Sequence, residues 1–195
     1  MSTVLRMTLL SLGAAAATAV AYAQDTGDTG TVVMPVRGSI MLTDPLNEMA
    51  DGEFYCFDIF GSTVEPGDGI QVHTCKDRPR PAEDMDFTVN APSVGNINVT
   101  QVDELCVATM RMAGAGSHLN VVACSTMDMR QQWVSDDLGQ VHPASDDTLC
   151  WTVADTRMCG NPGCTNYKRT LTLELCADQE PEYITWTIPG GSIGL

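Results

Sequence analysis

The stretch from Tyr55 to Cys75, YCFDIFGSTVEPGDGIQVHTC, holds the side chains of this chain that are best suited to bind a ligand. Asp58 follows the first cysteine by two positions, and Gln71 and His73 come shortly before the second. A carboxylate accepts hydrogen bonds, an amide donates and accepts them, and a flat imidazole ring does both. The set is suited to hold a polar ligand. In the alternative, structural interpretation, Asp58 closes a turn, Gln71 faces solvent and His73 packs against a loop.

No comparable set predicts catalysis. The three histidines, His73, His118 and His142, lie outside any helical zinc-binding motif and away from a recognised nucleophile motif. Gly116-Ser117-His118 places a hydroxyl beside an imidazole, but neighbouring residues of a strand point to opposite faces, so we interpret it as a loop. We therefore predict that the protein is not an enzyme and uses no cofactor or metal. A hydrolase that uses acidic residues on an unfamiliar scaffold is the remote alternative.

The 55–75 stretch recurs twice, at 105–124 and 149–176, and the first cysteines of the three copies are 50 and then 44 residues apart. A triplet of glycine, a polar residue and a β-branched residue enters each copy, at 38–40, 95–97 and 139–141. An aromatic residue follows each copy: Phe87, Trp133 and Trp186. A fixed period of this length is typical of an internally repeated architecture.

The elements that carry these residues are short β-strands. Runs rich in apolar and β-branched residues occur at 57–60, 70–72, 119–122 and 171–175, with turn residues between them. No stretch keeps a helical period over three turns. We predict an all-β domain with about four strands in each repeat, in which three repeats cover one another's edges by closing a barrel.

The eight cysteines are expected to form disulfides within the repeats. If each repeat is an independent copy, the pairs are Cys56–Cys75, Cys106–Cys124 and Cys150–Cys176. The remaining pair, Cys159–Cys164, encloses Asn-Pro-Gly and would staple the tip of an enlarged hairpin. A redox or zinc role for this pair is disfavoured because four intervening residues fit neither type of motif.

The N-terminus has the pattern of an export signal. Residues 1–23 carry one positive charge at Arg6, an apolar run and Ala21-Tyr22-Ala23, so we predict a cleaved signal peptide and a secreted or periplasmic protein; a retained N-terminal anchor is the alternative. Residues 24–36 are expected to be a flexible lead-in, and 37–195 the folded domain.

The net charge of −15 disfavours nucleic acid and anionic lipid as partners, and no other apolar run predicts membrane insertion. A neutral ligand such as a sugar is compatible with this charge.

Together, the Tyr-Cys and Leu-Cys pairs, the Ile-Gln-Val-x-x-Cys strand and Gln131-Gln132-Trp133 resemble the ricin-type (R-type, ricin B-like) β-trefoil lectin domain, over about residues 36–195. The resemblance implies three pseudo-symmetric lobes of four strands, at about 37–94, 95–138 and 139–195. It also implies that the Gln-x-Trp residues lie in the core. Apolar residues replace this signature in the other two lobes: Met85 and Phe87, Ile184 and Trp186.

The resemblance further implies one sugar-binding constellation in each competent lobe, built from four sequence slots: an acid, a glutamine, a ring and an amide. The first lobe offers Asp58, Gln71, His73 and Asp84. Two carboxylates in one site are expected to repel each other, which would raise one pKa or require a cation. The other lobes lack a carboxylate in the acid slot and are expected to be scaffolds; their slot residues are Ala108, Asn120, Val122 and Arg130, and Thr152, Thr172, Glu174 and Tyr183.

Two functions follow as hypotheses. The first is a secreted carbohydrate-binding protein with one sugar site in the first lobe and a galactose-like glycan as its partner. The alternative is a β-trefoil with decayed sugar sites that acts as a protein-binding or inhibitor module. In that case, the enlarged hairpin at 159–168 would contact the protein partner.

Overall fold

The computed structural model describes residues 34–46, 53–61, 63–76, 82–91 and 95–190. The predicted signal peptide and the lead-in up to residue 33 lie outside the described residues. The first strand, β1 (Met34–Gly38), begins inside the segment that was expected to be a lead-in. It does so because it pairs antiparallel with β5 (Phe87–Ala91) along its whole length, with Met34 opposite Ala91.

Each of the three repeats forms four strands, as predicted. The first lobe consists of β2 (Met41–Leu42), β3 (Tyr55–Ile59), β4 (Ile70–Thr74) and β5; the second of β6 (Asn98–Val99), β7 (Leu105–Thr109), β8 (Ser117–Ala123) and β9 (Trp133–Ser135); the third of β10 (Val141–Pro143), β11 (Leu149–Val153), β13 (Tyr167–Leu175) and β14 (Trp186–Thr187). One further short strand, β12 (Met158–Cys159), pairs with the start of β13.

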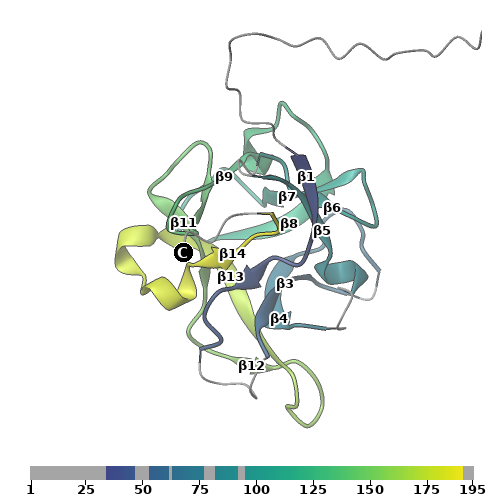
Figure 1. Ribbon diagram of the computed structural model, residues 1–195, viewed down its shortest axis with the longest axis vertical. Helices are drawn as coiled ribbons and strands as arrows, with labels where there is room; N and C mark the ends of the chain where they lie inside the picture. The colour runs from purple at the N-terminus through teal and green to yellow at the C-terminus, as the bar shows by residue number, and fades with distance from the viewer. Residues whose placement is uncertain (1–33, 47–52, 62, 77–81, 92–94, 191–195) are drawn as a thin grey trace, which may run out of the picture. The chain divides into compact units, whose positions relative to one another are not determined.

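The lobes close into a ring because the last strand of each pairs with the first strand of the next. Phe87 of β5 lies opposite Val99, Trp133 of β9 opposite Pro143, and Trp186 of β14 opposite Leu42, which returns to the first lobe. These equivalent aromatic residues therefore lie at the three junctions between lobes. Figure 1 shows one of these junctions, where β6 lies beside β5. The arrangement confirms the predicted fold, an all-β trefoil of three pseudo-symmetric repeats.

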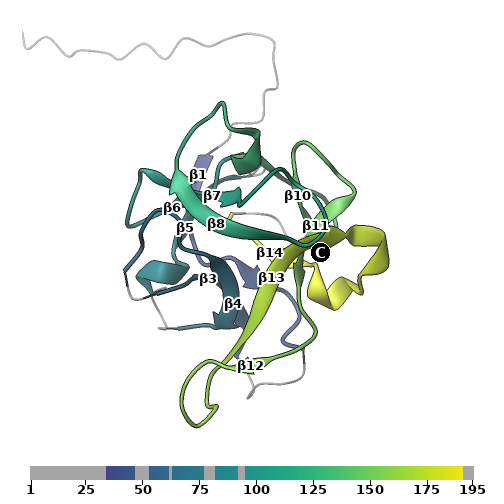
Figure 2. The same cartoon turned by 180° about the vertical axis from the view of Figure 1, so that it is seen from behind.

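The three long hairpins β3–β4, β7–β8 and β11–β13 meet through their second strands. Gly69 bridges to Asn120, Thr172 lies opposite His118, and Lys168 lies opposite His73. β13 is nine residues long and contacts both β4 and β8 (Figure 2). With β12 it forms a hairpin that projects at the bottom of both views and lies along the edge of the first lobe.

An aromatic cluster fills the centre of the barrel. Trp151 stacks on Phe57 with ring centroids 4.6 Å apart, and Trp133 and Trp186 meet Trp151 edge-on. The residues of the Gln-x-Trp slots are all buried: Met85, Phe87, Gln131, Trp133, Ile184 and Trp186. Gln131 is satisfied by Ser125 N–H at 2.8 Å, Asn96 Nδ2 at 3.1 Å and the carbonyl of Ala123 at 2.9 Å. Met85 and Ile184, which stand where the other two lobes would have this glutamine, carry no amide group that needs hydrogen-bond partners. The fold therefore tolerates apolar residues in place of the glutamine.

All four predicted cysteine pairs form disulfides, with Cα–Cα distances from 4.7 to 5.1 Å, and no described cysteine is free. The helical elements in the described part of the chain are single 3₁₀ turns: η1 (Glu83–Met85), η2 (Met129–Gln131), η3 (Cys176–Asp178) and η4 (Pro181–Tyr183). Among the described residues, no helix has the length and apolarity needed to cross a bilayer.

Candidate functional site

The first-lobe hairpin brings two of the predicted site residues into contact. Asp58 on β3 lies directly opposite Gln71 on β4, and Gln71 Nε2 donates to Asp58 Oδ2 at 2.7 Å. Alternate residues of a strand share a face, so His73 shares the face of Gln71. Both Asp58 and Gln71 are buried, with 1% and 7% of their surfaces exposed. The polar slots are therefore part of the interior of the lobe.

A lysine that the sequence analysis did not select completes this cluster. Lys76 Nζ donates to Asp58 Oδ1 at 2.7 Å and to Asp84 Oδ2 at 2.5 Å. Two neighbouring carboxylates were expected to raise one pKa or to require a cation, and Lys76 supplies a cation between them. Burial raises the pKa of Asp58, and the bonds from Lys76 and Gln71 oppose that rise. Burial also lowers the pKa of Lys76, but its two carboxylate partners outweigh this and leave the pKa above its ordinary value.

His73 is covered by the β12–β13 hairpin. Its Nδ1 lies 2.9 Å from the carbonyl of Thr74, and only 7% of its surface is exposed. A Cβ atom added to Gly160 would lie 2.5 Å from His73 Nε2, so the hairpin backbone approaches the ring at a position where only glycine fits. A sugar cannot stack on this ring in the present arrangement. Both carboxylate oxygens of Asp58 also already accept hydrogen bonds from Gln71 and Lys76, so neither is free for a sugar hydroxyl. Sugar binding in the first lobe stays a prediction.

The third lobe carries a cavity of about 370 Å³ that all four of its slot residues line. Thr152 on β11 lies opposite Thr172 on β13, Glu174 follows on the same face, and η4 supplies Tyr183. Thr172 Oγ1 donates to Glu174 Oε1 at 2.9 Å, which orients the carboxylate. Asp155, Asp178 and Glu180 also line the cavity, and among the described residues none of its carboxylates is in an ion pair.

The cavity therefore combines a carboxylate, hydroxyl groups and an aromatic ring, but in different slots from those expected. Glu174 occupies the ring slot and Tyr183 the amide slot. A residue-by-residue comparison misses this site because it looks for the carboxylate at Thr152. The pairing of β11 with β13 and the position of η4 bring the three groups together. Neither the strand pairing nor the position of η4 can be read directly from the sequence.

Arg169 supports this cavity from the interior. It is 1% exposed, its Nη1 donates to the carbonyl of Ala154 at 2.6 Å and also to that of Asp155, and its guanidinium carbon lies 6.0 Å from the centre of the Tyr183 ring. A buried cation near the ring face is attracted to it. Arg169 therefore holds both the Tyr183 ring and the loop after β11.

The second lobe provides no equivalent set. Ala108 in the acid slot is fully buried and apolar. Arg130 in the amide slot is held by Asp128 at 2.5 Å, and this hydrogen bond lowers the pKa of Asp128. That the second lobe is a scaffold without a sugar site stays a prediction.

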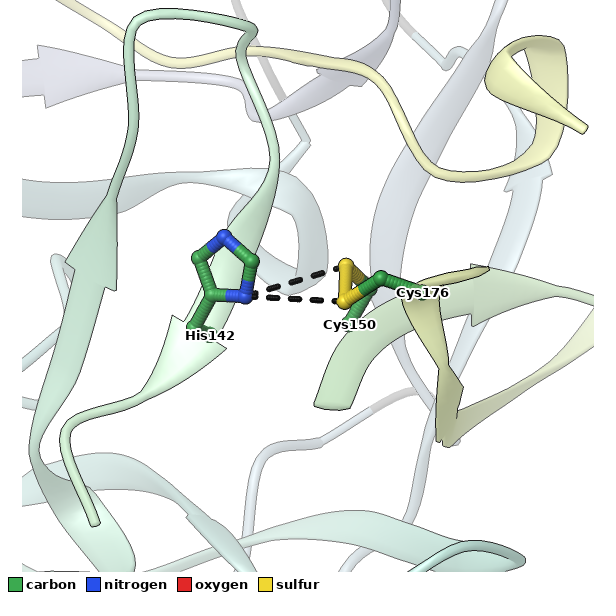
Figure 3. A group of neighbouring side chains, drawn as sticks. All are labelled: His142, Cys150 and Cys176. Carbon is green, nitrogen blue, oxygen red and sulfur yellow. Dashed lines mark hydrogen bonds between the residues drawn. A yellow bond between two sulfur atoms is a disulfide. The ribbon is translucent and has the colours of Figure 1, made fainter. Parts of the chain in front are cut away.

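One histidine–cysteine group has the spacing of a metal site. His142 Nδ1 lies 3.7 Å from the sulfurs of both Cys150 and Cys176, as Figure 3 shows. The two sulfurs are bonded to each other, and a disulfide has no thiolate to offer a metal ion. The ring nitrogens instead face the carbonyl of Leu149 at 3.0 Å and a carboxylate oxygen of Asp136 at 3.2 Å. We interpret His142 as a structural residue.

Comparison with solved structures identifies similar folds in several lectins. The β-trefoil lectin of the Vibrio vulnificus hemolysin/cytolysin, with N-acetyl-D-lactosamine bound, superposes with a TM-score of 0.52 at 11% identity, over 83% of this chain and 98% of that one. The C-terminal domain of an earthworm lectin, a mutant in complex with 6′-sialyllactose, gives 0.53 at 15% identity over 79% and 98%. The agglutinin of Abrus precatorius gives 0.51 at 14% identity over 81% and 48%.

No family model matches the sequence, and no curated protein matches it either. At these identities the structural similarity shows the fold alone: the chain is a β-trefoil.

Proposed function

We propose that this protein binds carbohydrate and that the sugar occupies the third-lobe cavity. One observation carries the proposal: the four third-lobe slot residues line a single cavity, whereas Asp58 in the first lobe is buried and bonded on both oxygens. The lectins with a similar fold support it, since the Vibrio lectin is described with N-acetyl-D-lactosamine and the earthworm domain with 6′-sialyllactose.

The chemistry of the cavity fits a sugar. The Tyr183 ring offers a flat surface for the C–H face of a pyranose, and the Glu174 carboxylate accepts hydrogen bonds from neighbouring hydroxyls. Hydrogen bonds to an ionised acceptor are about twice as strong as neutral ones, so Glu174 should dominate the polar contacts. A galactose-like ligand is our first choice. Because one small polar site buries little area, we expect a dissociation constant on the order of 0.1–10 mM.

We further infer that the protein is exported and acts without catalysis. The predicted signal peptide and four disulfides fit an oxidising compartment, either the periplasm or the cell exterior.

The test is binding of the exported, oxidised protein to galactose- and N-acetylgalactosamine-terminated glycans, with three variants beside it. Tyr183→Ala and Glu174→Gln should each reduce affinity at least tenfold, while Asp58→Asn should leave it unchanged. If Asp58→Asn loses binding while Tyr183→Ala and Glu174→Gln keep it, and circular dichroism shows that Asp58→Asn is folded, the sugar site would lie in the first lobe instead. No binding by any of these proteins would contradict the proposed function.

A protein-binding trefoil is the competing function, and one feature favours it. The β12–β13 hairpin and the adjoining end of β3 expose Met158 and Phe60 by 42% and 46%, and Lys168 Nζ lies 5.7 Å from the centre of the Phe60 ring. This function would be favoured if the protein binds no glycan but captures another exported protein, and if that capture is lost when Phe60 and Met158 are replaced.

A further inference from the structure

A second cavity, of about 420 Å³, lies at the tip of the β7–β8 hairpin in the second lobe. It is lined by Met110, Arg111, Ala115, Gly116, Ser117 and His118. None of these residues belongs to the third-lobe cavity, and none is a sugar slot of the second lobe. The Gly-Ser-His motif forms one wall of it. The sequence analysis interpreted this motif as a loop, but Ser117 and His118 are the first two residues of β8.

Backbone hydrogen bonds fix the shape of this loop. Met110 N–H donates to the carbonyl of His118 at 2.9 Å, and Ser117 N–H donates to that of Gly114 at 3.0 Å. Gly116 N–H donates to the carbonyl of Leu173 on β13 at 2.8 Å. Gly116 has a φ of +79°, a left-handed conformation that glycine adopts without strain. The backbone at the hairpin tip is therefore held by hydrogen bonds that involve neither the Arg111 nor the His118 side chain.

Three hydrogen-bond donors line this cavity without a strong partner. Among the described residues, Arg111 has no carboxylate within ion-pair distance and the His118 ring makes no hydrogen bond. The Ser117 hydroxyl makes only one long contact, 3.5 Å to the carbonyl of Met112. Within the described part of the chain, no acidic residue lines the cavity.

Arg111 has no carboxylate partner among the described residues, although the chain has 25 acidic residues and 10 basic ones. Arg37, Lys76 and Arg130 each bond to an aspartate. The hairpin tip is thus a local site of positive charge and free donors on an acidic protein. Arg111 and His118 are exposed, so their donors are hydrated and can exchange water for the oxygens of a ligand.

We propose that this cavity binds a small anion, carried either by a carboxylated or sulfated sugar or as a free inorganic anion. The planar guanidinium of Arg111 matches the two oxygens of a carboxylate or sulfate in a bidentate pair. Ser117 and His118 would bond the neighbouring oxygens. Met110, which is 52% exposed, offers an apolar wall for a sugar ring. The proposal does not depend on the sugar site of the third lobe.

The test is an amide NMR titration of the oxidised protein with glucuronate, glucose and inorganic sulfate at 0.15 M NaCl. At this ionic strength charges more than about 8 Å away are largely screened, so the local donors decide the outcome. Glucuronate should produce saturable shifts confined to residues 110–118, and glucose should produce none there. If sulfate binds as tightly as glucuronate, the natural ligand is a free inorganic anion. If sulfate binds more weakly, the natural ligand is an anionic group carried by a sugar.

Variants make the test specific. Arg111→Gln should weaken glucuronate binding at least tenfold and His118→Gln about threefold, while the matched control Arg130→Gln, whose arginine is already paired with Asp128, should bind as the native protein does. Since the Arg111 side chain does not hold the loop, its replacement should leave the other amide signals in place. No shift with either anion, equal binding of glucose and glucuronate, or unchanged binding by Arg111→Gln would overturn the proposal.

Discussion

Lys76 shows how one residue determines the state of a predicted site. Its ammonium group lies between Asp58 and Asp84 and uses the acceptors that a ligand would need. The sequence analysis assigned Asp58, Gln71 and Asp84 to one site and predicted that the two carboxylates would raise one pKa or require a cation; in the structure all three lie in one hydrogen-bonded cluster. The sequence did not reveal that the residue directly after Cys75 provides the cation, because the direction of a long, flexible side chain depends on tertiary packing.

The first prediction is that Lys76→Met destabilises the protein by about 2 kcal/mol. Breaking a fully buried ion pair costs about 3–5 kcal/mol because one charge is left unpaired, and the cost is lower here since the Lys76 side chain is 32% exposed. Denaturant unfolding without reductant measures the change. The double variant Lys76→Met/Asp58→Asn should recover much of the loss. Arg130→Met, which removes a more exposed pair, should cost less than about 1 kcal/mol; equal losses for the two single variants would contradict this account.

The second prediction concerns alkaline pH. The pKa of Lys76 is raised in the folded protein above 10.5, its ordinary value, which the unfolded chain retains. The stabilisation is therefore complete below that value and is lost as pH rises through the folded pKa, since the unfolded chain loses its proton first. We expect the stability difference between native protein and Lys76→Met to be constant from pH 7 to 9 and to shrink above about pH 10.5. A difference that grows with pH would contradict the ion-pair assignment.

At the scale of elements, the β12–β13 hairpin covers His73 of the first lobe. The Cys159–Cys164 staple and the Asn-Pro-Gly turn predicted an enlarged hairpin, and the structure confirms it. The sequence did not show that the hairpin would extend along β4, because that contact depends on the angle at which two lobes meet. The same limit explains the third-lobe cavity, whose residues were selected by slot while their convergence arises from packing.

The third prediction tests the contact between this hairpin and the first lobe. Gly160→Ala should push the hairpin away from His73, because the new Cβ would lie 2.5 Å from Nε2 and 3.1 Å from the carbonyl oxygen of Asn166. We expect a loss of about 1–2 kcal/mol and faster amide exchange across 158–168. Gly114→Ala, whose nearest neighbour is 3.9 Å away, is the neutral control. A double-mutant cycle with His73→Ala should show coupling; strict additivity would mean that the two residues do not interact.

At the scale of the whole molecule, pseudo-threefold symmetry supplies the fold while the lobes differ in chemistry. The period of the cysteines predicted three repeats that close a barrel, because each repeat needs its neighbours to cover its edges, and the family resemblance specified the β-trefoil. The aromatic residues at the junctions then share one core. The repeats need not preserve the ligand groups for this purpose. In the first lobe Lys76 bonds to Asp58, and in the second lobe the acid slot holds the apolar Ala108. In the third lobe the slot residues line a cavity.

The last prediction follows from that asymmetry and rests on the proposed sugar site. One open lobe implies one galactose-like site in each chain, so calorimetric titration should give a stoichiometry near one. A monomer with one site cannot cross-link, and we expect no rise in light scattering when it is mixed with a galactose-bearing polymer; linking two chains in tandem should restore cross-linking and raise the apparent affinity roughly 100-fold or more. Tyr183→Ala in both halves of the tandem protein is the control and should abolish the effect. Cross-linking by a protein that remains monomeric would require a second working lobe, and Asp58→Asn would then show whether the first lobe opens in solution.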